Sequence, residues 1–225
     1  MMNRPVNSWQ QLSGQAPFRL PEDSLPIADF SRTATEGLAL HLELLPEPFL
    51  GSPEAPVVLL NLNPGFSPED QQHHEDPFFA ARCRDNLLHR PVDYPFYLLD
   101  PNIKGPGQRW WDRKLGPLIQ RVGRQTVARG ILCVEYFPYY SRRFGHRGLS
   151  LPSQQYSFAL VREAINRRAL VLLLRSKRLW FAAVPELVSY ERLYKMKSVQ
   201  NPTVSPRNCP EGFERAVRAL EEIAA

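Results

Sequence analysis

Cysteine is scarce in this sequence, which has only Cys83, Cys133 and Cys209 among its 225 residues. The three lie far apart and form no CxxC pair, which argues against a disulfide framework and is typical of a reducing compartment. Three cysteines also cannot supply the set of four thiolate ligands that an iron–sulfur cluster commonly takes. We therefore expect neither a metal nor another cofactor.

Long apolar runs are also missing. The longest, residues 169–174, falls far short of the roughly 20 residues that span a bilayer. The N-terminus lacks the apolar stretch of a secretory signal, so we expect a cytoplasmic protein with no membrane partner. There is no GxSxG motif and no Walker loop, which disfavours an unrelated α/β hydrolase or a P-loop enzyme.

Positive charge is in modest excess, with 28 Lys and Arg against 23 Asp and Glu and a net charge of +5. Such an excess favours a polyanionic partner only weakly, and the position of the charges is more informative. One short segment mixes basic and aromatic side chains: Tyr139, Tyr140, Arg142, Arg143, Phe144, His146 and Arg147. This mixture is typical of a nucleic-acid surface, and a solvated basic loop is the alternative. DNA is the predicted partner.

The order of elements predicts an α/β fold. Twenty-two prolines predict long ordered loops, and residues 1–50 read as an irregular arm packed on the domain, with a short helical patch near 35–45. Residues 51–225 read as one domain. Apolar runs predict strands at 57–62, 131–137, 170–174 and 193–199, and helical periodicity predicts helices at 110–122, 153–168, 177–187 and 211–223. We expect a three-layer α/β/α sandwich with a central, mostly parallel four-stranded sheet.

Unusual polar segments follow each predicted strand. They are residues 63–65, 135–140, 175–177 and 200–207. In open α/β sheets, ligands bind beyond the carboxyl ends of the strands. The functional site is therefore expected at that edge of the sheet.

Two of these segments carry motifs. Residues 57–66 read VVLLNLNPGF, and residues 201–207 read NPTVSPR. Together they resemble the two signature loops of the uracil-DNA glycosylase superfamily. The closest branches are the mismatch-specific uracil/thymine enzymes, with NPG and a late NPSGLSR-like loop, and the single-strand-selective monofunctional enzymes, which also have NPG. The sequence QRWW at 108–111 is similar to the NRFW segment of the mismatch-type branch, so the resemblance covers about residues 56–222.

The resemblance implies a monofunctional DNA glycosylase that flips out a damaged or modified base and hydrolyses its N-glycosidic bond. Asn63 would position the attacking water, and Asn201 would bind the departing base. Gly65 and the amide of Phe66 would contact the base. The candidates for an aromatic that stacks on the base are Phe66, Phe96 and Tyr97, with Phe78 and Phe79 as alternatives.

The second loop and the basic segment would hold the DNA. By the same resemblance, Thr203 and Ser205 bind phosphates, Val204 is the apolar wedge that fills the vacated stack, and Arg207 contacts the backbone or the partner base. Arg142 and Arg143 complete the predicted DNA-binding set. We expect a monomer, and both DNA repair and defence against modified phage DNA are compatible with this activity.

The sequence departs from the superfamily pattern in its missing acid and histidine. The most active uracil enzymes carry an acid in the first loop and a histidine in the second, where this chain has asparagine. A general base would have to come from Glu69 or Asp70, although a solvated loop is the simpler interpretation of both. A solvated loop is likewise the simpler interpretation of residues 73–76, where two histidines and two acids could otherwise suggest a metal site. Lysine is missing from both loops, which favours monofunctional chemistry. The alternative is a weak or inactive glycosylase fold that only binds DNA.

Glu135 is the second departure. The single-strand-selective enzymes have an asparagine three residues before a proline at this position, and that asparagine reads the edge of uracil. An ionised carboxylate only accepts hydrogen bonds, so it would repel O4 of uracil and favour an amino-bearing base, such as a modified cytosine. A protonated Glu135 would still serve uracil or hypoxanthine. A structural ion pair with a nearby arginine, such as Arg142, is the remaining alternative.

Overall fold

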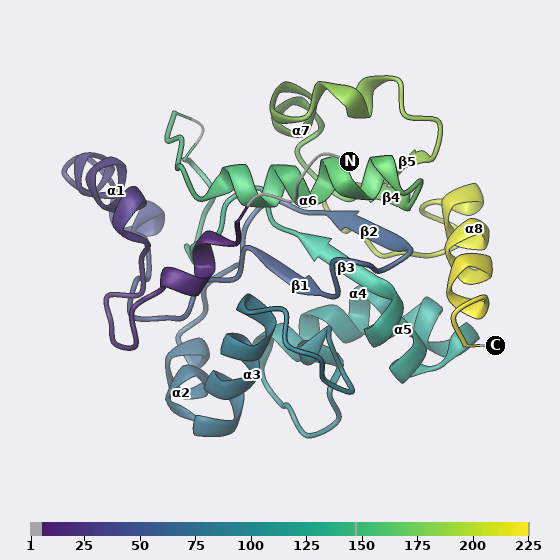
Figure 1. Cartoon of the computed structure of the whole chain (residues 1–225), viewed down its shortest axis with the longest axis horizontal. Helices are drawn as coiled ribbons and strands as arrows, with labels where there is room; N and C mark the ends of the chain where they lie inside the picture. Colours follow the sequence, from purple (N-terminus) through teal and green to yellow (C-terminus); the bar gives the residue numbers. More distant parts are fainter. Residues whose placement is uncertain (1–5, 147, 225) are drawn as a thin grey trace.

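Five short strands form the sheet within residues 6–146 and 148–224, which the computed structural model describes (Figure 1). Their order is β1-β3-β2-β4-β5, with β1 antiparallel to β3 and every other pair parallel. The strands are β1 (Phe49–Gly51), β2 (Val57–Leu60), β3 (Ile131–Val134), β4 (Leu170–Leu173) and β5 (Leu193–Lys195). The sheet is therefore mixed but mostly parallel.

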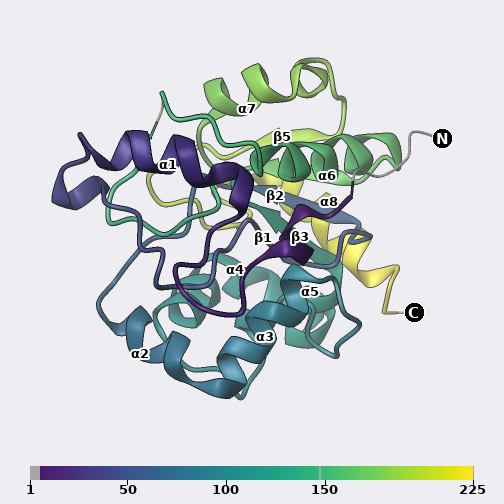
Figure 2. The same ribbon diagram turned by 60° about the vertical axis from the view of Figure 1, so that its left-hand side comes forward.

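Helices cover both faces of the sheet. The described residues form eight: α1 (Ser24–Ser31), α2 (Glu69–Glu75), α3 (Pro77–Leu87), α4 (Pro106–Val122), α5 (Arg124–Gly130), α6 (Gln154–Asn166), α7 (Lys177–Ala183) and α8 (Pro210–Glu221). Figures 1 and 2 show α6 and α7 on one side of the strands and α3, α4 and α5 on the other. Alternate residues of β2 point to opposite faces: Val57 and Leu59 pack with α4, α5 and α8, whereas Val58 and Leu60 pack with α6.

The predicted strands and helices from residue 57 onward are present with bounds that differ by a few residues, and α4 begins four residues earlier than predicted, but the number of strands was wrong. Strand β1 supplies a fifth and lies across the expected boundary between residues 50 and 51. The helical patch near 35–45 was also misplaced, because the arm's α-helix is α1 and only a 3-10 turn, Glu36–Leu38, forms there. Three residues are too few to show a period, so β1 is defined by its pairing with β3.

The arm packs tightly on the rest of the chain. Trp9, Leu20 and Ile27 are each 1% exposed and belong to the same apolar cluster as Val58 and Leu60.

Among the described helices, none is long and apolar enough to cross a membrane.

The free edge of β1 is closed by one side chain from α3. Asn86 is buried, its Nδ2 donates to the carbonyl of Phe49 at 2.7 Å, and its Oδ1 accepts from the amide of Gly51 at 3.0 Å. These bonds satisfy backbone groups that an edge strand would otherwise leave open.

Asn86→Ala is therefore expected to lower the free energy of unfolding by about 2–4 kcal/mol, because it leaves two buried backbone groups without partners. Urea unfolding monitored by circular dichroism measures the change. Asn166→Ala, at an exposed position at the end of α6, is the matched control and should have little effect. Equal midpoints for the two variants would contradict this role of Asn86.

Candidate functional site

The loops that follow β2 and β3 stay joined beyond the ends of the strands. The amide of Phe137 donates to the carbonyl of Leu62 at 2.9 Å, and that of Phe66 donates to the carbonyl of Ser141 at 3.1 Å. Gly65 and Ser141 form a parallel bridge. The first signature loop and the segment after Glu135 therefore form one surface at the carboxyl edge of the sheet, where a site was predicted.

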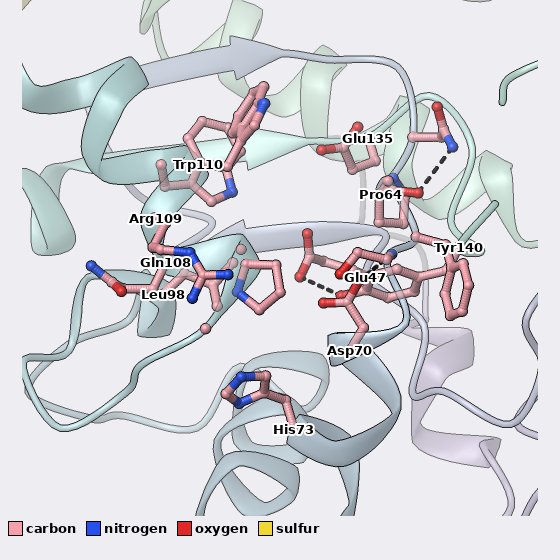
Figure 3. A pocket seen from close by; sticks show the side chains of 18 of the residues that line it. Glu47, Pro64, Asp70, His73, Leu98, Gln108, Arg109, Trp110, Glu135 and Tyr140 are labelled. Carbon is pink, nitrogen blue, oxygen red and sulfur yellow. Dashed lines mark hydrogen bonds between the residues drawn. The ribbon is translucent and has the colours of Figure 1, made fainter. Parts of the chain in front are cut away.

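A cavity of about 650 Å³ opens at this edge. Its walls include Asn63, Gly65, Phe66, Glu135 and Arg142, which brings five of the predicted site residues together. Figure 3 shows Gln108, Arg109 and Trp110 on one side of the pocket and Pro64 and Tyr140 on the other. A volume of this size is typical of small-molecule and cofactor sites.

Asn63 has a fixed amide group. Its Nδ2 donates to the carbonyl of Pro64 at 2.9 Å and to Oγ of Ser141 at 3.1 Å. Since both bonds use the nitrogen, Oδ1 is left to accept a hydrogen bond from a ligand or a water. Gly65 is exposed, and a Cβ added there would meet no atom within 4 Å, so the pocket is open beside its backbone.

Phe66 forms an aromatic and cationic stack at the mouth of the pocket. Its ring is parallel to the imidazole of His41, with centroids 3.3 Å apart, and the guanidinium of Arg142 lies 5.7 Å from the ring centroid. The expectation that the Phe66 amide contacts a base was wrong for this conformation, because that amide already donates to Ser141.

The first turns of α4 form another wall. Gln108, Arg109, Trp110 and Trp111 all line the pocket, which agrees with the placement of this segment at the start of a helix. Trp110 packs edge-on against Trp111, with centroids 4.5 Å apart, and remains partly exposed. It is an aromatic candidate that the sequence analysis did not select.

Glu135 is buried at the inner end of the pocket. Its Oε1 accepts a hydrogen bond from Nδ2 of Asn61 at 2.8 Å, and its Oε2 has no partner among the described residues. Burial and the nearby charge of Glu47 raise the pKa of Glu135 to about 8. Arg142 does not pair with Glu135, since it is exposed and lies over Phe66. The arginine whose charge acts on Glu135 is Arg175, which also lines the pocket and lowers the pKa of Glu135 in part.

Glu47 is a second buried carboxyl in the same wall, and the sequence analysis missed it. Its Oε2 accepts hydrogen bonds from the hydroxyls of Tyr97 at 2.9 Å and Tyr140 at 3.0 Å. Burial raises the pKa of Glu47 to about 7, despite the two hydroxyl donors that lower it. The backbone of residues 47–48 is bonded to the loop after β3, because Glu47 N donates to Pro138 O and Glu135 N donates to Pro48 O, both at 2.9 Å.

The acids after the first loop are not on a solvated loop. Asp70 is buried at the start of α2, where its Oδ2 accepts from the amide of Ser67 at 2.6 Å, and it lines the pocket. Glu69 is exposed and pairs with Arg109 at 2.6 Å. His74 is on the same helix, and its Nδ1 accepts from the amide of Leu45 at 3.0 Å, so the expectation of a solvated loop for 73–76 was also wrong. Burial lowers the pKa of His74 to about 4.

The second signature loop lies beside the pocket. Asn201 is exposed, and its Oδ1 accepts a hydrogen bond from Nζ of Lys114 on α4. The neighbouring carbonyl of Gln200 accepts from Arg175 at 3.3 Å, and Arg175 itself lines the pocket. The two loops therefore share one edge of the sheet, but Asn201 is outside the pocket wall and its oxygen is occupied.

Val204 was wrongly predicted as an exposed wedge. It is fully buried in the apolar core, and its amide donates to the carbonyl of Lys114 at 2.9 Å. Thr203 and Ser205 are half-buried, and Arg207 is exposed. Their loop is held by a residue that the sequence analysis missed, Asn208, whose Nδ2 donates to carbonyls of Ser198, Asn201 and Thr203.

Several other predicted site residues lie in the interior. Phe96 is fully buried against Trp111, and Tyr97 is buried with its hydroxyl on Glu47, so neither is free to stack on a base in this conformation. In the basic segment, Arg143 is exposed but is not part of the pocket wall, and His146 is buried and bonded to Leu38 O at 3.0 Å. Arg147 lies outside the described residues.

No protein-family model, curated protein or solved structure matches this chain. Its function must therefore be inferred from the site itself. In the part of the chain that the structure describes, no group of three or more His, Cys, Asp or Glu side chains is placed to hold a metal ion.

Proposed function

We propose that this protein is a monofunctional DNA glycosylase that binds a flipped-out base in the pocket and hydrolyses its N-glycosidic bond. The observation that carries the proposal is the meeting of Asn63 and Glu135, from two neighbouring strands, in one cavity beside the aromatic start of α4. The helices on both faces of the sheet fit the three-layer α/β/α arrangement that the resemblance to the uracil-DNA glycosylase superfamily predicts. The cavity volume suits a nucleobase with part of its sugar.

Different residues of the pocket bind the base and position the attacking water. A base that enters the cavity packs beside Trp110 and meets Glu135 and Asn61 at the inner end. Oδ1 of Asn63 accepts a hydrogen bond from the attacking water. The water oxygen forms a bond to the sugar C1′, the bond from C1′ to the base nitrogen breaks, and the water proton leaves with the base. Because an amide cannot remove a proton, the sugar must develop its positive charge before water attacks.

The decisive experiment is a screen of single- and double-stranded oligonucleotides that carry uracil, hypoxanthine, and modified or alkylated bases. The expected result is strand cleavage only after alkali treatment, which reports an abasic site. Cleavage without alkali, together with borohydride trapping that Lys114→Ala abolishes, would instead make the enzyme bifunctional. If no oligonucleotide loses a base at any pH at which the protein is folded, the proposed activity is excluded.

A DNA-binding protein without chemistry is the second candidate. It is favoured by the position of Asn201, which lies outside the pocket wall and so does not reach a departing base in this conformation. Tight binding to DNA without base release in the screen would support it.

Arg142 is expected to contact a phosphate, since it is exposed and lies over Phe66 at the mouth of the pocket. Arg142→Ala should weaken DNA binding and reduce the slope of log Kd against log salt by about 0.7–0.9, the effect of one lost phosphate contact. Fluorescence anisotropy at several salt concentrations measures the slope. Arg129→Ala removes an equally exposed charge outside the pocket and should leave the slope unchanged. Equal slopes of log Kd against log salt for the two variants would show that Arg142 does not contact the DNA.

A further inference from the structure

The inner end of the pocket contains buried oxygen atoms that lack hydrogen-bond partners. Asn61 is 5% exposed and Glu135 is 2% exposed, and both line the cavity. The hydrogen bond from Asn61 Nδ2 to Glu135 Oε1 uses one polar atom of each side chain. Asn61 Oδ1 and Glu135 Oε2 are left without partners among the described residues. A buried polar atom without a partner costs free energy, so a ligand that pairs with both oxygens is favoured.

Glu47 adds a third oxygen to the same wall. Both tyrosine hydroxyls donate to its Oε2, so Oε1 receives neither of them. Glu47 is 6% exposed and lines the same pocket as Glu135, and its charge helps to raise the pKa of Glu135. Asn61 Oδ1 can only accept, and each carboxyl can supply at most one proton. Asn61 Nδ2 keeps one further N–H, so with both carboxyls ionised the acceptors outnumber the donors at the inner end of the pocket.

From this arrangement we infer that the pocket selects a base with an exocyclic amino group next to a ring nitrogen, as in cytosine, adenine and their modified forms. The inference takes from the proposed function that the ligand is a nucleobase. An exocyclic amino group offers two N–H donors, whereas the N–H and carbonyl edge of uracil or hypoxanthine offers one donor and an additional acceptor. The amino group therefore suits the excess of acceptors better than the lactam edge does.

Glu135 pairs with such a base in either protonation state, but only the ionised state discriminates against a lactam base. As a carboxylate, it accepts a hydrogen bond from the amino group. As a carboxylic acid, its Oε2 donates to the unprotonated ring nitrogen while Asn61 Oδ1 accepts from the amino group. With Glu135 ionised, a lactam base in the same position would bring its carbonyl oxygen against Asn61 Oδ1 or Glu135 Oε2, with no proton between the two oxygens. With Glu135 protonated, Oε2 can donate to that carbonyl.

The test compares free bases that differ only in this edge: cytosine with uracil, and adenine with hypoxanthine. Quenching of tryptophan fluorescence reports binding, since Trp110 and Trp111 line the pocket. Above about pH 8, where Glu135 is ionised, each amino-bearing base is expected to bind about tenfold or more tightly than its lactam counterpart, the effect of hydrogen bonds to a charged or buried group. In Glu135→Gln, a permanent donor replaces one acceptor at nearly constant shape, and the ratio should fall to near one.

Glu75→Gln is the matched control, because it removes an exposed carboxyl on α2 that does not line the pocket. It should retain the wild-type ratio. Equal or tighter binding of the lactam bases, an unchanged ratio in Glu135→Gln, or no binding of any of the four bases would each overturn the inference.

The outcome is separable from that of the proposed function. Selective binding of amino-bearing bases without base release from any oligonucleotide would exclude the glycosylase while leaving the specificity intact. Release of uracil in preference to amino-bearing bases would support the glycosylase and overturn the inferred specificity.

Discussion

Base release by Asn63→Ala is expected to be about 100-fold slower or more, since a water that is no longer held in line with C1′ reacts poorly. Only Oδ1 of Asn63 is available for this task, because Nδ2 is committed to Pro64 and Ser141. The rate is measured in single turnover with the best substrate from the oligonucleotide screen. Substrate binding, measured separately, should change much less than the rate.

Two further variants sharpen this result. Ser141→Ala removes one of the two acceptors that orient the Asn63 amide, so we expect a smaller loss of rate with an unchanged pH profile. Asn102→Ala, on an exposed turn where the side chain pairs only locally with Asp100, should be as active as the wild type. A wild-type rate in Asn63→Ala would show that the water is held elsewhere.

The contribution of Glu135 to stability should be lost as the pH rises from about 4.5 to 8, while the lowered pKa of His74 acts in the opposite direction below about pH 6.5. Burial first, and then the charge of Glu47, raise the pKa of Glu135 from 4.5 to about 8. The folded state therefore holds a proton that the unfolded state releases. This contribution is complete below the unfolded pKa and is lost as the pH rises through the folded pKa. At 1.36 kcal/mol per pKa unit, the loss is on the order of 4 kcal/mol.

Urea unfolding of the wild type and of Glu135→Gln, at pH values between about 4.5 and 9, isolates this effect, because glutamine does not titrate. The difference in free energy of unfolding between the two proteins should shift in favour of the variant as the pH rises. Glu69→Gln, which changes an exposed carboxyl, should follow the wild type. Parallel profiles for the wild type and Glu135→Gln would contradict a raised pKa at Glu135.

Local patterns in the sequence predicted most of the sheet but not its edge. The apolar runs that became β2, β3 and β4 are continuous, and all their residues are buried, which is the pattern of strands covered on both faces. Strand β1 has three residues and follows Pro46 and Pro48. Its pairing depends on β3 and on Asn86, both distant in the chain, so no local period could show it.

The difference between local patterns and contacts of distant residues also explains which site residues could be predicted. Asn63 and Glu135 were found because the resemblance to the uracil-DNA glycosylase motifs marks their positions, which lie at or just after apolar strands. Glu47 was missed because it reaches the pocket from the arm, through the pairing of β1. Asn61 is polar within an apolar run, which was the available signal for it. Val204 was misread because an apolar residue in a loop suits the core as well as a DNA wedge, and only its burial decides between them.

The antiparallel pairing of β1 with β3 also bears on biosynthesis. Phe49 pairs with Val134, so the arm leaves the ribosome long before its partner strand exists. Contacts between residues so far apart form late in folding. Nascent chains halted before residue 131 would therefore lack both the edge of the sheet and a properly seated Glu47, and we expect ligand-binding competence to emerge only after synthesis has passed that strand.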